Sequence, residues 1–257
     1  MISEQTADTP IITVDVLGVH VACVGTPQIL HQVTIWAHQH DLRTIFYVNA
    51  HCLNVAYTHA RYQQVLNQAD LVYPDGISVV WAGRLLGGCR MQKATGADWI
   101  APFCALAVQQ QWRLYVLAGK PGIARQACSR LMQQWPGLNI VGMCDGFFHE
   151  KTEQEVLDDI RRTHPHVLFV GMGIPRQEIW LASHRHHIKT PVCWAVGALF
   201  DYVAGVEPRV PTWMNQLALE WLWRLIVDPT GKWRRYLIGN PLFVARIWHQ
   251  KQLSRRH

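Results

Sequence analysis

Residues 166–201 decide the fold, and they read HVLFVGMGIPRQEIWLASHRHHIKTPVCWAVGALFD. Residues 166–171 and 191–196 are short apolar runs rich in β-branched side chains, and residues 179–187 between them have a helical pattern. The first run ends in a Gly-x-Gly loop. A strand, a glycine loop, a helix and a second strand form the βαβ unit of a parallel sheet. This stretch therefore predicts an α/β protein.

Polar and glycine residues follow both predicted strands. Gly171, Gly173, Gln177 and Glu178 come after the first strand, and Asp201 comes after the second. In parallel sheets, ligands bind beyond the carboxyl ends of the strands, because the loops there present free backbone N–H groups and helix N-termini. We therefore expect these five residues at a substrate-binding edge.

The rest of the chain repeats the alternation of strands and helices. Strand patterns occupy residues 11–24 (broken at Gly18), 43–49, 70–73, 113–118 and 136–141. Helical patterns occupy residues 26–40 (with Thr26 as N-cap), 51–68, 77–86, 99–110, 123–134 and 152–163. No internal repeat is apparent. This order predicts a doubly wound, mostly parallel, Rossmann-like sheet.

Bulk composition fits a globular protein. The chain has 257 residues, of which 49% are hydrophobic and 16% charged. No apolar run reaches the roughly 18 residues that a membrane-spanning helix needs. The start of the chain lacks the basic and apolar segments of a signal peptide, so we expect a cytoplasmic protein. Seven cysteines without C-x-x-C spacing predict buried free thiols in a reducing compartment.

The net charge of +6 is concentrated at the C-terminal end. Residues 207–257 hold nine Lys or Arg, three acids and five of the 12 tryptophans, whereas residues 1–206 are balanced. We therefore expect an α/β domain over residues 1–206 and a helical appendage over residues 207–257. A basic segment rich in Trp suits an anionic membrane surface or a phosphate-bearing ligand. An ordinary solvated basic helix remains the alternative, and we expect no nucleic-acid partner.

Near the end of the chain, apolar residues recur at helical spacing beside basic ones. Phe243, Val244, Ile247 and Trp248, with Lys251 at the edge, form such a stripe. A stripe of this kind can lie on a membrane surface. We therefore expect this helix to face the bilayer.

Asp75 stands at the predicted end of a strand and the start of a helix, within Pro74-Asp75-Gly76. A carboxylate at this place can serve as a general base. It can equally be a helix N-cap, which accepts backbone N–H bonds and requires no substrate. Both interpretations stay open on the local sequence.

Two other function classes compete with a transferase. Gly171-x-Gly173 is half of a dinucleotide-binding fingerprint, which would suit a nucleotide-dependent oxidoreductase, but Arg176 stands where the third glycine belongs. A non-catalytic membrane-surface binding module is the second alternative. The histidines show no metal-binding spacing, and there is no D-x-D motif at a strand end. We therefore expect neither a metal nor another cofactor.

Taken together, a series of motifs in this order resembles the WecG/TagA/CpsF family of glycosyltransferases (glycosyltransferase family 26). The resemblance covers roughly residues 16–236. Its pieces are VLG (16–18), Asn49, ADLVYPDG (69–76), TGAD (95–98), VGMGIPRQE (170–178), GALFD (197–201), AG (204–205), RVPTWM (209–214), LEWLWRL (219–225) and RRY (234–236).

The resemblance implies an inverting transfer of a hexose, such as glucose, N-acetylmannosamine or its uronate, from a UDP-sugar to a sugar on a polyprenyl diphosphate. It further implies a peripheral enzyme of cell-surface polysaccharide or exopolysaccharide synthesis at the inner face of the cytoplasmic membrane, acting without a metal. Asp75 becomes the expected general base, Gln177 a substrate contact, and Arg224 and Arg234 candidates for the donor diphosphate. The oligomeric state stays open, a homo-oligomer included.

Four further residues complete the expected substrate-binding set: Asn49, Lys93, Thr95 and Asp98. The chain departs from the family pattern at three positions. Tyr47 stands where the family usually has Thr, Lys93 where it usually has Arg, and Gly231 where an Arg is expected. Lys93 cannot make the bidentate contact of an Arg. The departures leave the identity of the donor sugar open.

Overall fold

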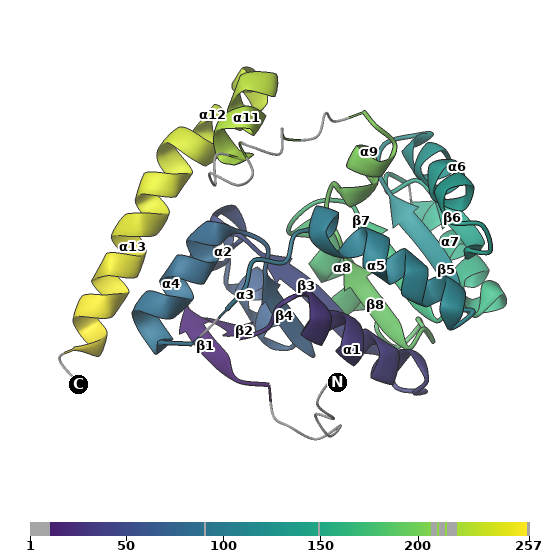
Figure 1. The fold of residues 1–257 in the computed structure, drawn as a ribbon, viewed down its shortest axis with the longest axis horizontal. Coiled ribbons are helices and arrows are strands. Elements are labelled where there is room, and N and C mark those ends of the chain that lie inside the picture. Colours follow the sequence, from purple (N-terminus) through teal and green to yellow (C-terminus); the bar gives the residue numbers. More distant parts are fainter. Residues whose placement is uncertain are drawn as a thin grey trace.

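The computed structural model describes residues 11–89, 91–148, 150–206, 210, 214 and 220–255. Its centre is a six-stranded parallel sheet of order β4-β3-β8-β7-β5-β6, with β1 and β2 as a separate antiparallel pair (Figure 1). The strands are β1 (Thr13–Val16), β2 (Val19–Ala22), β3 (Arg43–Val48), β4 (Leu71–Pro74), β5 (Arg113–Ala118), β6 (Asn139–Cys144), β7 (Val167–Gly171) and β8 (Val192–Ala195). The predicted doubly wound, mostly parallel α/β fold is confirmed.

Helices cover both faces of this sheet and continue into the C-terminal segment (Figure 1). They are α1 (Thr26–Ala37), α2 (Ala50–Thr58), α3 (Ala60–Asn67), α4 (Ile77–Gly87), α5 (Gly96–Gln109), α6 (Ile123–Gln134), α7 (Glu150–Thr163), α8 (Arg176–His184), α9 (Leu199–Val203), α11 (Glu220–Val227), α12 (Pro229–Trp233), the π-helical turn η1 (Arg234–Ile238) and α13 (Gly239–Ser254).

The strands separate two hydrophobic cores. Leu168 and Val170 of β7 belong to the core that includes residues of α2, α3, α4, α7 and α8. Val167 and Phe169 of the same strand belong to the core that includes residues of α1, α5, α6 and α9. Because both sides of such a strand are buried, its sequence is a continuous apolar run. Trp99 of α5 stacks on Trp194 of β8 at 4.0 Å between ring centroids, which fixes α5 against the sheet.

Several helix boundaries differ from the sequence prediction, among them those of α1 and α2. The N-cap of α1 is Gly25, not Thr26. The predicted helix over residues 51–68 divides at His59, which leaves the helical region at φ −123° and ψ 89°. The His59 ring accepts the backbone N–H of Tyr62 at 3.1 Å and so caps α3. Capping by a histidine ring has no strong sequence signature, so the break could not be seen in the pattern.

The cysteine prediction is wrong for three of the seven cysteines. Cys23 and Cys89, 66 residues apart in the chain, form a disulfide, and Cys144 is partly exposed. Cys52, Cys104, Cys128 and Cys193 are buried free thiols, as expected. The pairing was invisible in the sequence because it depends on the end of α4 meeting the edge of the β1–β2 hairpin.

The terminal helix α13 packs on the α/β domain. It contacts α2 and α4, and its Phe243 and Ile247 are buried in the hydrophobic core, 3% and 4% exposed (Figure 1). Val244 and Trp248 are 65% and 61% exposed. The expected membrane-facing stripe is therefore wrong for Phe243 and Ile247, because this helix has apolar side chains on two sides and one side completes the core.

Polar contacts hold α13 at both ends. The Asn54 amide on α2 donates to the carbonyl of Gly239 at 2.7 Å. The Gln250 amide donates to the Asp15 carboxylate at 2.8 Å and accepts from the backbone N–H of Leu17 at 2.9 Å. The division of the chain at residue 206 stays a prediction.

Several sequence features lie outside the described residues: positions 1–10, most of the RVPTWM motif including Arg209, the boundary around Pro208, Leu219, and the terminal Arg256. Among the residues that are described, no helix combines the length and the apolar character needed to cross a bilayer.

Candidate active site

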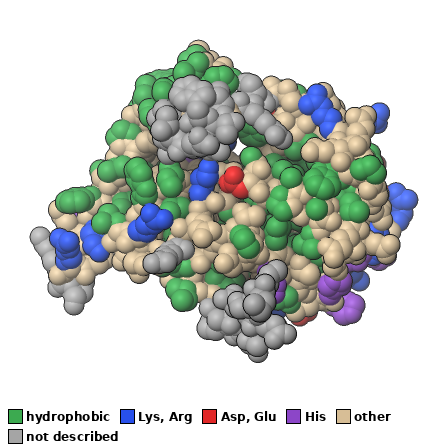
Figure 2. Space-filling model, in the orientation of Figure 1, with side chains coloured by type: hydrophobic (Ala, Val, Ile, Leu, Met, Phe, Trp, Pro, Cys, Tyr) green, Lys and Arg blue, Asp and Glu red, His purple; other side chains and the backbone are tan. Residues whose placement is uncertain are grey.

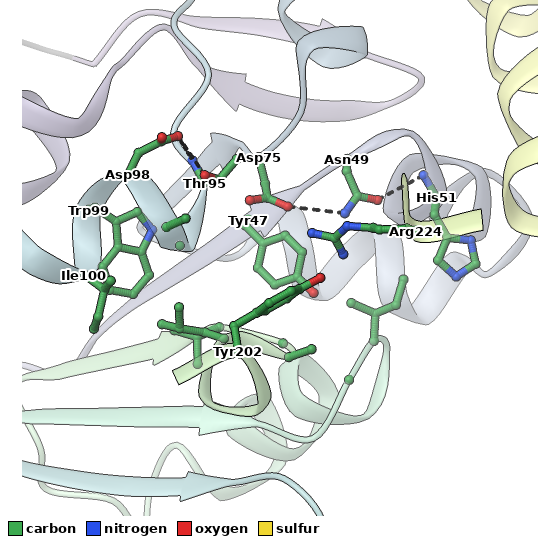
Figure 3. A pocket seen from close by; sticks show the side chains of 18 of the residues that line it. Tyr47, Asn49, His51, Asp75, Thr95, Asp98, Trp99, Ile100, Tyr202 and Arg224 are labelled. Carbon is green, nitrogen blue, oxygen red and sulfur yellow. Dashed lines mark hydrogen bonds between the residues drawn. The ribbon is translucent and has the colours of Figure 1, made fainter. Parts of the chain in front are cut away.

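A pocket of about 460 Å³ opens beyond the carboxyl ends of β3, β4, β7 and β8 (Figure 3). Its wall combines strand-end loops, the first turn of α5, α9 and two arginines of the C-terminal segment. Of the sequence-predicted residues, it brings together Asn49, Asp75, Thr95, Asp98, Gly173 and Arg224. The position agrees with the general rule for ligand sites in α/β sheets.

Asp75 occupies the loop between β4 and α4, at the centre of the pocket (Figure 3). Its backbone N–H donates to the carbonyl of Val48 at 2.9 Å, which holds the loop against β3. The N-cap of α4 is Gly76, so the capping interpretation of Asp75 is wrong. The Asn49 amide points at the Asp75 carboxylate, with 3.5 Å between Nδ2 and Oδ2.

Asn49 is itself fixed by the helix that follows it. Its side-chain oxygen accepts the backbone N–H groups of His51 and Cys52 at 3.0 and 3.2 Å, which caps α2. Since this oxygen is occupied by N–H donors, the amide nitrogen must turn to Asp75. The cap therefore orients the group that contacts the carboxylate.

Thr95 and Asp98 form a capping box at the start of α5. Asp98 Oδ2 accepts the Thr95 backbone N–H at 2.8 Å and the Thr95 hydroxyl at 2.7 Å. Helix α5 thus begins at Gly96, three residues before the predicted start, with its first turn lining the pocket. A helix N-terminus presents backbone N–H groups and a partial positive charge, which suits a phosphate group.

The C-terminal segment contributes two cations to the pocket. Arg224 of α11 lies over the ring of Tyr202, at 5.2 Å from the ring centroid, and points toward Asp75 (Figure 3). Arg235 of η1 also lines the pocket. Its neighbour Arg234 is outside the lining and lies over the ring of Trp233 at 5.3 Å. The sequence prediction named Arg224 and Arg234, so it missed Arg235.

His51 is a second lining residue that sequence reasoning missed. Burial lowers the pKa of His51 to about 4, and the nearby Arg235 guanidinium contributes to the shift. The imidazole is therefore neutral at neutral pH and can accept a hydrogen bond from a ligand hydroxyl. A lone histidine at the first position of the predicted helix gave no signal for this place.

Tyr47 and Gly197 meet at the floor of the pocket. Gly197 has φ +57°, and a Cβ atom there would lie 2.4 Å from the Tyr47 hydroxyl. Burial raises the pKa of Tyr47, so its phenol stays protonated. Tyr47 therefore forms part of the pocket floor near Asp75 (Figure 3).

The remaining predicted residues lie around the pocket rather than in its wall. Gln177 and Glu178 are fully buried behind it, and the side-chain oxygen of Gln177 accepts the Gly197 backbone N–H at 3.0 Å. Lys93, Gly171 and Asp201 are absent from the lining among the described residues. Gly171 is needed for close packing, since a Cβ there would lie 2.5 Å from the carbonyl oxygen of Gly197.

The arrangement places two carboxylates, one neutral imidazole, two guanidinium groups and a helix N-terminus around a single cavity. Asp98 Oδ2 accepts two hydrogen bonds from Thr95, whereas Asp75 faces the Asn49 amide. The Asp75 carboxylate can accept a proton, and the cations can stabilise a departing anion such as a diphosphate. Within the described part of the chain, no group of three or more His, Cys, Asp or Glu side chains is arranged to hold a metal ion.

Comparison with known proteins assigns the chain to a family. The family model described as the glycosyl transferase WecG/TagA/CpsF family matches residues 14–257. Three similar proteins share the name N-acetylglucosaminyldiphosphoundecaprenol N-acetyl-beta-D-mannosaminyltransferase. The protein of Bacillus spizizenii is 29% identical over 90% of this chain and 89% of its own length. That of Bacillus subtilis is 31% identical over 68% of each chain. That of Staphylococcus aureus is 26% identical over 93% of each. The chain is therefore a member of the WecG/TagA/CpsF family of glycosyltransferases.

Proposed function

We propose that the protein transfers an N-acetylmannosamine residue from its UDP-linked form to a polyprenyl-diphosphate-linked N-acetylglucosamine, with inversion at the anomeric carbon. The names of the three relatives support this donor sugar over glucose or the uronate, and they support this acceptor. The product would serve the synthesis of a cell-surface polysaccharide. The observation that carries the proposal is the placement of Asp75 in one pocket with Arg224 and Arg235.

In the proposed reaction, the Asp75 carboxylate takes the proton from the acceptor hydroxyl as its oxygen attacks the anomeric carbon. The bond between that carbon and the UDP oxygen breaks, and UDP leaves with the bonding electron pair. Because attack and departure occur on opposite faces of the sugar, the configuration inverts. The Asn49 amide, 3.5 Å from the carboxylate, keeps Asp75 turned toward the cavity.

The leaving diphosphate develops negative charge that the pocket can stabilise. Arg224 and Arg235 are the two guanidinium groups in the wall, and the first turn of α5 adds backbone N–H groups. Fixed cations and dipoles of this kind can replace the charge that a metal ion supplies in other transferases. We therefore propose a reaction that does not require a divalent cation.

The C-terminal segment would also hold the enzyme at the membrane that carries its acceptor, on the inner face. Trp221, Trp233, Leu237, Val244 and Trp248 all expose large apolar side chains. In Figure 2, hydrophobic and basic side chains lie together on the side of the molecule where Figure 1 places α4 and α13. Lys and Arg near an anionic bilayer contribute about 1 kcal/mol each, so several together can retain a protein there.

A transfer assay tests the function directly. The purified protein is incubated with UDP-N-acetylmannosamine, or with other UDP-sugars, and a short-chain polyprenyl-diphosphate N-acetylglucosamine, with EDTA present in one series. Formation of a lipid-linked disaccharide and UDP, unchanged by EDTA, is expected. Absence of transfer from every UDP-sugar would contradict the function, and loss of transfer in EDTA that Mg²⁺ restores would contradict the role of the arginines. Binding of NAD would favour the oxidoreductase alternative.

A further inference from the structure

Behind the pocket lies a buried polar pair that the proposed reaction does not use. Gln177 and Glu178, at the start of α8, are both 0% exposed. Carboxylates are seldom buried completely unless they are paired with a cation or fully hydrogen-bonded. The environment of Glu178 therefore needs an explanation.

The pair forms a bridge to the pocket wall. The Gly197 backbone N–H donates to Gln177 Oε1 at 3.0 Å, and Gln177 Nε2 donates to Glu178 Oε1 at 2.7 Å. Because a backbone N–H can only donate, it fixes the orientation of the Gln177 amide, and the amide nitrogen must then face Glu178. The bridge joins α8 to residues 196–198, the loop between β8 and α9 that lines the pocket.

The second carboxyl oxygen of Glu178 is left without a partner. Glu178 Oε2 is buried and has no hydrogen-bond partner among the described residues, and the same holds for the hydroxyl of Tyr62 on α3, which packs against α8. A buried ionised oxygen without a donor is costly, whereas a protonated oxygen carries no charge and can itself donate. The geometry therefore favours the neutral acid.

The surroundings of Glu178 agree with a neutral form. Burial raises the pKa of Glu178 to about 8. The titratable groups that face Glu178 are Tyr47, Cys52 and Tyr62. Burial raises the pKa of Cys52 to about 12 and raises the pKa of each of the two tyrosines, so all three groups are uncharged at neutral pH. The charges that also act on this cluster are the Asp75 carboxylate and the Arg235 guanidinium on the pocket side.

We propose that Glu178 is a positioning residue that acts as a neutral carboxylic acid, holding the Gln177 amide so that it anchors the Gly197 loop beside Asp75. Ionisation of Glu178 places an uncompensated charge behind the wall, and solvation of that charge requires water to enter between α8 and the loop. The pocket therefore loosens as pH rises through the titration of this residue. The consequence for activity rests on the proposed transferase function, whereas the consequence for the loop does not.

The test compares three variants with the wild type between pH 6 and 9.5. Glu178→Leu keeps the approximate size but removes the acceptor for Gln177. Glu178→Gln keeps the acceptor and cannot ionise. Glu155→Gln makes the same chemical change at an exposed position of α7 and is the matched control. Transfer is measured as kcat/KM, and the protection of the Gly197 amide against hydrogen exchange is measured by ¹⁵N NMR and corrected for the intrinsic exchange rate.

In the wild type and in Glu155→Gln, kcat/KM and Gly197 protection should both fall above about pH 8, by roughly tenfold per pH unit for a single deprotonation. In Glu178→Leu, the protection of the Gly197 amide should be lost and kcat/KM should be lower than in the wild type by at least about tenfold at every pH. In Glu178→Gln, both quantities should match their wild-type values near pH 7 and should not fall above about pH 8. A decline that persists in Glu178→Gln overturns the proposal, as does full Gly197 protection in Glu178→Leu. If the protein transfers no sugar, the exchange data still decide the role of Glu178, and only the proposed function fails.

Discussion

At the scale of single residues, two adjacent arginines provide a matched pair. Arg235 lines the pocket, whereas Arg234 lies over Trp233 outside its lining. Hydrogen bonds to a charged group contribute about 1.5–3 kcal/mol, so Arg235→Ala should weaken UDP binding by about 10- to 100-fold. Arg234→Ala should change it by less than about threefold, since a surface charge contributes little. Calorimetric titration with UDP measures both, and equal losses in the two variants would contradict the assignment.

His51 provides a pH-dependent prediction. Its folded-state pKa of about 4 lies below the unfolded value of about 6.5, so the unfolded chain binds more protons between these values. The stability that neutral His51 contributes is therefore fully present above about pH 6.5 and is lost as pH falls toward 4. His51→Gln should lose less in melting temperature than the wild type between pH 7 and 4.5. Parallel melting curves of the two proteins would contradict the shifted pKa.

The sequence located part of this site and missed the rest for physical reasons. Asp75 and Asn49 end strands of a parallel sheet, and strand ends can be predicted from apolar runs. The choice between Arg234 and Arg235 depends on the turn of η1, where π-helical geometry shifts which side chain faces inward. His51 gains its place only because α2 begins beside the pocket. The burial of Gln177 and Glu178 depends on how α8 meets the loop after β8.

At the scale of elements, α13 is attached to the α/β domain through one face. Phe243 is buried there, whereas its neighbour Val244 is 65% exposed. Truncation of a buried Phe to Ala costs about 3–5 kcal/mol, and surface substitutions usually stay within about 0.5 kcal/mol. Phe243→Ala should therefore lower the free energy of unfolding strongly and Val244→Ala should not. Urea denaturation measures the difference, and similar midpoints would show that α13 is not part of the cooperative unit.

The spacing of apolar residues in the sequence could not show which face of α13 packs on the α/β domain. Its apolar residues occur on two sides, and a helical pattern does not state which side packs on protein. Central elements were easier to predict, because β7, β8 and the part of β5 that follows Arg113 are buried on both sides and their sequences are uninterrupted apolar runs. The division of residues 51–68 into α2 and α3 was missed because a histidine ring supplies the cap.

At the scale of the whole molecule, the basic C-terminal segment has two proposed roles, one in the pocket and one at the membrane. It brings Arg224 and Arg235 to the pocket, and it leaves Trp248 61% exposed on its outer side. We predict that Trp248→Ala weakens binding to vesicles containing anionic lipid, with unchanged UDP affinity. Met132→Ala on α6, another exposed apolar position, is the control. Sedimentation with vesicles at low and high salt measures the effect, and equal binding by all three proteins would contradict a membrane role for this surface.

We propose that Asp75 acts as the base of an inverting transfer, in a pocket that the C-terminal arginines complete. This role is tested most directly by NMR, following the anomeric signal of a ¹³C-labelled UDP-sugar during one turnover in the wild type and in Asp75→Asn. We expect a product of opposite anomeric configuration, together with UDP release. In Asp75→Asn the rate should fall by about 10²–10⁴ with little change in melting temperature, since Gly76 and not Asp75 caps α4. Retention of configuration, or a near-normal rate in Asp75→Asn, would contradict the proposed role.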